Sequence, residues 1–176
     1  MEAEHTVARL PTRALDALQP ETRRALEPVI ARGPLADVWL QFANSEPALR
    51  AYLAMEVALE GGALSAREIE AIKLRVSRIN DCGFCLGVHA AKGRRVGLGH
   101  AAQAAIAAGT SLDEPRLDAL LAIVTAFFER PGTLPEPLID RARAAGIDDV
   151  TLMDLSMAVA AIFFTNIANH VNATGA

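Results

Sequence analysis

Aromatic residues are scarce in this chain of 176 residues, and strand-like patterns are missing from it. Aromatics make up 5% of the residues, whereas hydrophobic residues reach 52%. The apolar content is therefore mainly Ala, Leu, Ile and Val, a composition suited to packed helices. No run of alternating apolar and polar residues bounded by turn residues is present, so we expect no β-strands. These absences predict an all-α fold.

Strong positive charge and targeting signals are also missing. The net charge is −4, and the densest basic cluster is Lys92-Gly-Arg-Arg95. Nucleic acid is therefore not expected as a partner. The first residues, Met-Glu-Ala-Glu-His-Thr, are acidic and lack the apolar segment of a signal peptide. We accordingly expect a cytoplasmic protein.

One segment near the C-terminus is apolar nearly all round, from Met157 to Phe164. This run is much shorter than the roughly 20 apolar residues that cross a bilayer, so no membrane is expected as a partner. Asp154 and Asn166 flank the run. A helix with this pattern is typically buried in a core or a subunit interface, and we therefore expect a homo-oligomer.

Turn and capping signals divide the chain into helices without a linker long enough to separate domains. A capping box is expected between Ser65 and Glu68. We predict helices at about 20–33, 35–43, 46–60, 66–79, 82–96, 100–108, 113–129, 134–145 and 148–171. Residues 1–176 are thus expected to form one helical bundle. Residues 1–19 are expected to form an N-terminal arm that packs on a neighbouring subunit.

Only two cysteines occur, and both lie in the segment Cys82-Gly-Phe-Cys85. The preceding Asn80-Asp81 is a helix-start signal, because either side chain can accept a hydrogen bond from the next turn. The helix is expected to stop at Gly97, with Leu98 placed for the hydrophobic contact beyond it. The cysteines then lie in the first turn, where the helix dipole can lower the pKa of a thiol below about 8.5.

His89 follows Cys85 by four residues, so the two side chains share one helix face. Cys82 lies one turn earlier, near enough to close a disulfide. Glu70 belongs to the preceding helix, which can turn back at Asn80-Asp81. Its carboxylate can then orient His89, as an acid orients the base in other sets of nucleophile, base and orienting residue. These residues predict an activated thiol with a resolving partner and a proton relay.

Two other interpretations of the cysteine pair stay open. Free cysteines are often buried as small hydrophobes. Alternatively, Cys82, Cys85 and His89 supply three of the four ligands of a structural zinc site, with Glu70 or His170 as the fourth. No second C-x-x-C is present, and we favour redox chemistry with no bound metal. No flavin, haem or nucleotide motif occurs, so no cofactor is expected.

Three successive motifs carry a resemblance to a known family. They are Leu-Ser-x-Arg-Glu-x-Glu, then Val-Ser-x-x-Asn-x-Cys-x-x-Cys-x-x-x-His, and then Arg-Arg-x-Gly-Leu, within residues 64–98. They resemble the alkylhydroperoxidase D (AhpD)-like group of the carboxymuconolactone decarboxylase superfamily, whose core is expected at about 64–130. The family's Glu, Cys, Cys and His positions fall at Glu70, Cys82, Cys85 and His89. The founding members carry a second His just before the second Cys, where this chain has Phe84.

The resemblance implies an all-helical, oligomeric thiol peroxidase or disulfide reductase. It implies that Cys85 attacks a hydroperoxide, that Cys82 resolves the product, and that Glu70 and His89 relay protons. An external dithiol of lipoamide or thioredoxin type would then reduce the disulfide. Two alternatives stay open: a cofactor-free decarboxylase or lactone-type enzyme of the same superfamily, and a zinc-binding or redox-sensing module without turnover.

Overall fold

The computed structural model of the chain is all-helical over the residues that it describes, 8–130 and 132–174. No β-strand occurs in these residues, so the predicted all-α class is confirmed. The α-helices are α1 (Pro20–Ile30), α2 (Asp37–Phe42), α3 (Glu46–Glu60), α4 (Ala66–Ile79), α5 (Gly83–Arg95), α6 (His100–Ala108), α7 (Pro115–Glu129), α8 (Glu136–Ala144) and α9 (Asp149–Asn172). Two short 3-10 helices, Leu15–Ala17 and Ala43–Ser45, complete the order.

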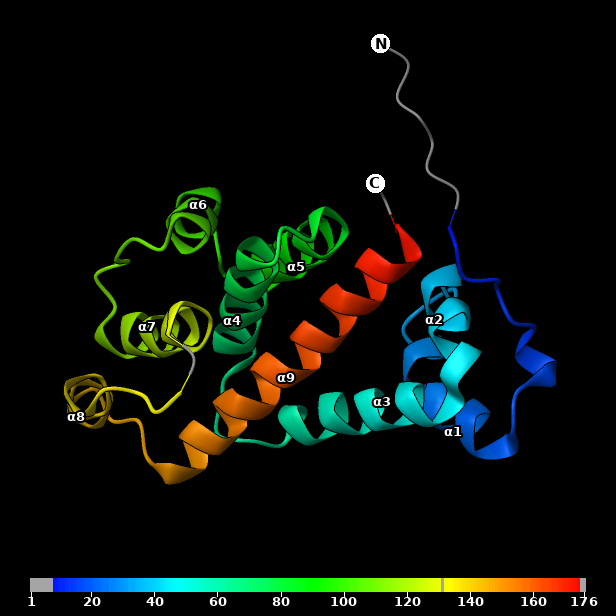
Figure 1. Cartoon of the computed structure of the whole chain (residues 1–176), viewed down its shortest axis with the longest axis horizontal. Coiled ribbons are helices and arrows are strands. Elements are labelled where there is room, and N and C mark those ends of the chain that lie inside the picture. The colour runs from blue at the N-terminus through cyan, green and yellow to red at the C-terminus, as the bar shows by residue number, and fades with distance from the viewer. Residues whose placement is uncertain (1–7, 131, 175–176) are drawn as a thin grey trace, which may run out of the picture.

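The long helix α9 runs across the molecule, with α1 and α2 at one end and α6, α7 and α8 at the other (Figure 1). It packs on α3 and α4. The central helix α4 also contacts α5, α6 and α7. Its side chains enter both hydrophobic clusters, Ile72 and Val76 in one, Ala71 and Leu74 in the other. This shared helix supports the single-domain organisation that we propose.

Two of the predicted helix ends are present as expected. Ser65 caps α4, accepting a hydrogen bond from the backbone N–H of Glu68, whose carboxylate accepts one in return. At the end of α5, Gly97 has a positive φ of 85°, and the N–H of Leu98 donates to the carbonyl of Gly93 at 2.8 Å. Leu98 is fully buried. This is the glycine-ended helix stop that the sequence predicts.

Helix α5 begins within one residue of its predicted start, but the predicted role of Asn80-Asp81 as its start signal is wrong. These two residues instead end α4, because Asp81 has a positive φ of 52° and the N–H of Cys82 donates to the carbonyl of Ser77 at 2.9 Å. Asp tolerates this left-handed conformation better than most residues. Cys82 is itself the N-cap of α5, and no side chain caps that helix. The sequence signal was ambiguous, since Asn and Asp favour both kinds of helix end.

The described part of the N-terminal arm, residues 8–19, packs on its own chain. The N–H of Arg9 donates to the carbonyl of Asn172, and that of Arg13 donates to Leu40. Residues 1–7 lie outside the described structure, and contact of the arm with another subunit stays a prediction. Among the described helices, α9 alone is long and apolar enough to cross a membrane by length and composition. Its packing on α3 and α4, with Leu155 fully buried, is that of a core helix.

Candidate functional site

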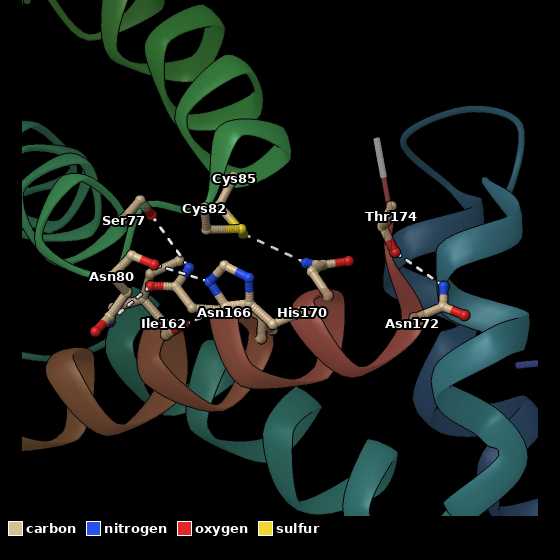
Figure 2. The surroundings of a disulfide bond; sticks show 11 residues. Ser77, Asn80, Cys82, Cys85, Ile162, Asn166, His170, Asn172 and Thr174 are labelled. Atoms are coloured by element: carbon tan, nitrogen blue, oxygen red, sulfur yellow. Dashed lines mark hydrogen bonds between the residues drawn. A yellow bond between two sulfur atoms is a disulfide. The ribbon is translucent and has the colours of Figure 1, made fainter. Parts of the chain in front are cut away.

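The two cysteines form a disulfide at the N-terminal end of α5, facing α9 (Figure 2). Their Cα atoms are 5.3 Å apart, and each residue is 3% exposed. The N-cap side chain of α5, that of Cys82, makes no capping hydrogen bond. Such a helix terminus favours negative charge, and therefore a thiolate once the disulfide is reduced.

Glu70 and His89 meet directly, as the sequence predicts for two helices folded against each other. A carboxylate oxygen of Glu70 on α4 lies 2.7 Å from Nδ1 of His89 on α5. Both residues are buried. Burial raises the pKa of Glu70, but its hydrogen bond with His89 and the charges of His89, Lys73 and Lys92 outweigh that effect, so the net pKa is lowered. Glu70 is therefore an anion at neutral pH.

The imidazole of His89 is neutral at neutral pH. Burial lowers the pKa of His89 more than the hydrogen bond and charge of Glu70 raise it. A neutral ring that faces a carboxylate through Nδ1 carries its proton there and donates it. Its Nε2 is then an unprotonated acceptor, with no hydrogen bond to the described residues. This tautomer is that of a general base rather than a standing cation.

Asn169 is a site residue that sequence reasoning missed. Its Nδ2 lies 3.3 Å from Sγ of Cys85, across from α9 to α5. Its Oδ1 is buried and has no hydrogen-bond partner among the described residues. A disulfide sulfur carries no proton, so only the N–H side of the amide can face it favourably. A signal was present in the sequence, because Asn166, Asn169 and Asn172 recur every three residues in the last helix.

His170, which we considered as a zinc ligand, lies elsewhere. It is exposed, and its Nε2 lies 2.8 Å from the carbonyl oxygen of Asn80 (Figure 2). Asn80 also donates to Asn166 from its side chain. These contacts tie the α4–α5 junction to α9. Within residues 8–130 and 132–174, no group of three or more His, Cys, Asp or Glu side chains is placed to hold a metal ion.

A cavity of about 410 Å³ opens beside Cys85 and His89. Phe84, which replaces the second His of the founding family members, lies in its wall. Cys82 does not line it, so of the two cysteines only Cys85 borders this cavity. The cavity has the size and mixed lining of a small-molecule site.

Tyr52 and Glu56 also lie in the cavity wall. Burial, with the charges of Glu56 and Glu70, raises the pKa of Tyr52 well above its ordinary value, so its phenol stays protonated. Both carboxylate oxygens of Glu56 lie 2.7 Å from Nζ of Lys73, a lysine that is 3% exposed. A cation this deeply buried needs its carboxylate partner.

The fold and site together define an all-helical protein with a C-x-x-C disulfide beside a Glu–His pair. Residues 46–126 match the model of the carboxymuconolactone decarboxylase family. The solved structure of the alkylhydroperoxidase AhpD core of a peroxidase-related protein from Ralstonia eutropha JMP134 is 25% identical, with a TM-score of 0.81. That match covers 94% of this chain and 90% of the other.

A protein of unknown function from Agrobacterium tumefaciens, named as a candidate antioxidant defence protein AhpD, is 26% identical with a TM-score of 0.68. That match covers 76% of this chain and 92% of the other. The debrominase Bmp8 shares the fold at 16% identity, with a TM-score of 0.73 and coverage of 98% and 92%. No curated protein matches the chain. The family model and the AhpD and peroxidase-related names of these structures thus support the AhpD-like resemblance that the motifs carry.

Proposed function

We propose that this protein is a thiol-dependent oxidoreductase that reduces organic hydroperoxides with Cys85 as the attacking thiol. The observation that carries the proposal is that Cys85, paired with Cys82, is the one cysteine in the cavity wall, and that His89 shares this wall. The AhpD and peroxidase-related names of two similar solved structures support the same chemistry. Glu70, Cys82, Cys85 and His89 are the proposed catalytic set.

In the proposed first step, neutral His89 accepts the proton of the Cys85 thiol through Nε2. Glu70 stabilises the resulting imidazolium through the hydrogen bond at Nδ1. The Cys85 thiolate attacks the terminal oxygen of the hydroperoxide, and the O–O bond breaks. Cys85 becomes a sulfenic acid, and the departing alkoxide takes the proton from His89 and leaves as an alcohol.

Cys82 closes the cycle, because its sulfur is within bonding reach of Cys85. The Cys82 thiol attacks the sulfenic sulfur, water leaves, and the disulfide forms. An external dithiol of lipoamide or thioredoxin type then supplies two electrons and two protons, becoming a disulfide itself. No other redox group is required, because the two thiols carry both electrons.

A thiol count before and after mild peroxide tests this function. The reduced protein should lose both thiols to one equivalent of hydroperoxide, without intermolecular bonds on non-reducing gels. A dithiol should restore both thiols. A protein whose thiols alkylate readily yet survive peroxide is no peroxidase, and a decarboxylase or an interaction module would give that result.

A further inference from the structure

The cavity beside Cys85 is lined by apolar and aromatic side chains along most of its wall. The residues come from α1, the α1–α2 segment, α2, α3, α5 and α9. The apolar lining side chains include Val29, Val38, Trp39, Phe42, Leu53 and Val88. Trp39 stacks on Tyr52 with ring centroids 5.9 Å apart, which keeps this wall rigid. Such a surface suits a hydrocarbon chain.

The polarity of the wall changes along one face of α5. Cys85, His89, Lys92 and Arg95 all line the cavity and follow one another at helical spacing. Cys85 and His89 are buried, whereas Lys92 and Arg95 are exposed. The redox centre therefore lies at the closed end of the cavity, and two cations lie at its mouth.

Lys92 and Arg95 form no salt bridge within the described residues, although the charge of Lys92 acts on Glu70. Glu56 pairs with Lys73, and Glu70 is hydrogen-bonded to His89, whose ring is neutral. Glu60 pairs with Arg32, which lines the same mouth. The mouth thus carries an excess of positive charge, and this charge is at the correct end of the cavity to meet an anionic group remote from Cys85.

We infer that the cavity binds an amphipathic hydroperoxide whose apolar chain fills the wall and whose carboxylate contacts Lys92 and Arg95. This inference rests on the proposed function, because the cavity orients the substrate by placing the peroxide at Cys85. The O–O cleavage is unchanged, and the carboxylate takes no part in it. Its role is to fix which end of the substrate enters first.

Binding is measurable without turnover, because Trp39 is the chain's single tryptophan and lines the cavity. The disulfide form should be titrated with decanoate, 1-decanol and decyltrimethylammonium while Trp39 fluorescence is followed. Decanoate should bind about tenfold or more tightly than decanol, as expected for hydrogen bonds to charged groups. The quaternary ammonium should bind most weakly.

Charge variants of α5 separate the inference from a general effect of surface charge. The double variant Lys92→Ala with Arg95→Ala should lose the preference for decanoate over decanol. Arg94→Ala is the matched control, because Arg94 belongs to the same helical turn but does not line the cavity; its preference should match the wild type. Lys92→Glu with Arg95→Glu should reverse the order of decanoate and decyltrimethylammonium. Equal binding of the three ligands, or a preference lost in Arg94→Ala as well, would overturn the inference.

A kinetic comparison keeps this inference distinct from the proposed function. The reduced protein should react faster with linoleic acid hydroperoxide than with cumene hydroperoxide, which has no carboxylate. The ratio of the two rates should fall in the double alanine variant and stay unchanged in Arg94→Ala. Equal rates in the wild type would contradict the proposed substrate class but not the proposed peroxidase function. If the wild type reacts with neither peroxide but still binds decanoate, the peroxidase function is contradicted and the anion site is not.

Discussion

The side-chain amide of Asn169 donates to Cys85 across 84 positions of sequence, with 3.3 Å between Nδ2 and Sγ. This hydrogen bond is a direct polar contact between the sulfur of Cys85 on α5 and helix α9. The acceptor Oδ1 of the same amide is enclosed without a partner, which costs about 1–3 kcal/mol. A buried amide that leaves its own oxygen unpaired while its N–H faces a sulfur is poorly explained by stability alone.

We expect Asn169→Leu to raise the pKa of the Cys85 thiol, because the thiolate loses a hydrogen-bond donor. A hydrogen bond to a charged group contributes about 1.5–3 kcal/mol, which corresponds to roughly one to two pKa units. The measurement is the pH profile of alkylation in the Cys82→Ser background, where Cys85 reacts alone. His170→Ala, at the adjacent exposed position, should leave the profile unchanged, and an unshifted profile in Asn169→Leu would refute the role.

Glu70→Gln tests the relay. The carboxylate raises the pKa of His89 against the effect of burial, so the variant should lower that pKa further and weaken His89 as proton acceptor. The pKa of Cys85 should consequently rise in the same alkylation assay. The control is Glu68→Gln, which alters the α4 cap and should cost about 0.5–2 kcal/mol of stability without moving the profile. Equal shifts in both variants would make Glu70 a bystander.

The pKa of His89 also predicts how stability depends on pH. Burial lowers it in the folded protein relative to 6.5, so the unfolded chain binds the proton first as the pH falls. The free energy of unfolding should therefore decrease as the pH drops below about 6.5, until the lowered folded pKa is reached. Glu70, whose folded pKa is lowered from 4.5, loses its stabilising contribution in a separate, more acidic window. Urea unfolding between pH 7 and 5 measures the first effect, and His89→Gln should flatten it; an equally steep slope in that variant would assign the effect to other groups.

The two cysteines should behave differently when substituted singly. Cys82→Ser should still react with peroxide and stop at a sulfenic acid that a dimedone-type probe traps. Cys85→Ser should lose the fast reaction, because Cys82 lies outside the cavity wall and has no contact with Asn169. Labelling of only the Cys85→Ser protein would reverse the assignment.

An exposed apolar stripe on α9 supports the predicted homo-oligomer. Val150, Met153, Phe163, Ile167 and Val171 are each 39–70% exposed and repeat at helical spacing along the outer face. Charged substitutions at Phe163 and Ile167 should lower the mass found by light scattering at micromolar concentration. A wild-type monomer at that concentration would contradict the prediction.

The neighbouring Phe164 differs from Phe163, since it stacks on Tyr52 and meets Phe42 inside the protein. Phe164→Asp should therefore destabilise the fold rather than the assembly, by several kcal/mol for an unpaired buried charge. The two phenylalanines could not be distinguished from the sequence. The run from Met157 to Phe164 is apolar on every face, so it does not indicate which side of the helix is exposed to solvent.

Local signals were sufficient for most of the fold. The capping box at Ser65 and the glycine stop at Gly97 each depend on a few adjacent residues, and both are present. The Glu70–His89 contact was predictable because only one short turn separates their helices. Asn169 was not, since its meeting with Cys85 depends on how α9 packs after the intervening helices. The role of Asn80-Asp81 was assigned wrongly because Asp81 fits both a helix end and a helix start.

The Asn169–Cys85 contact joins the thiol segment to the last described helix, and this order has a consequence for biosynthesis. A chain emerging from the ribosome presents its N-terminal segments first, so Cys82 and Cys85 are made well before α9. Until α9 docks on α3 and α4, Cys85 has neither its amide donor nor the wall that Thr165 and Asn169 supply. The Cys85 thiol of the nascent chain therefore lacks the Asn169 donor, and we expect it to reach its full reactivity only once α9 is in place.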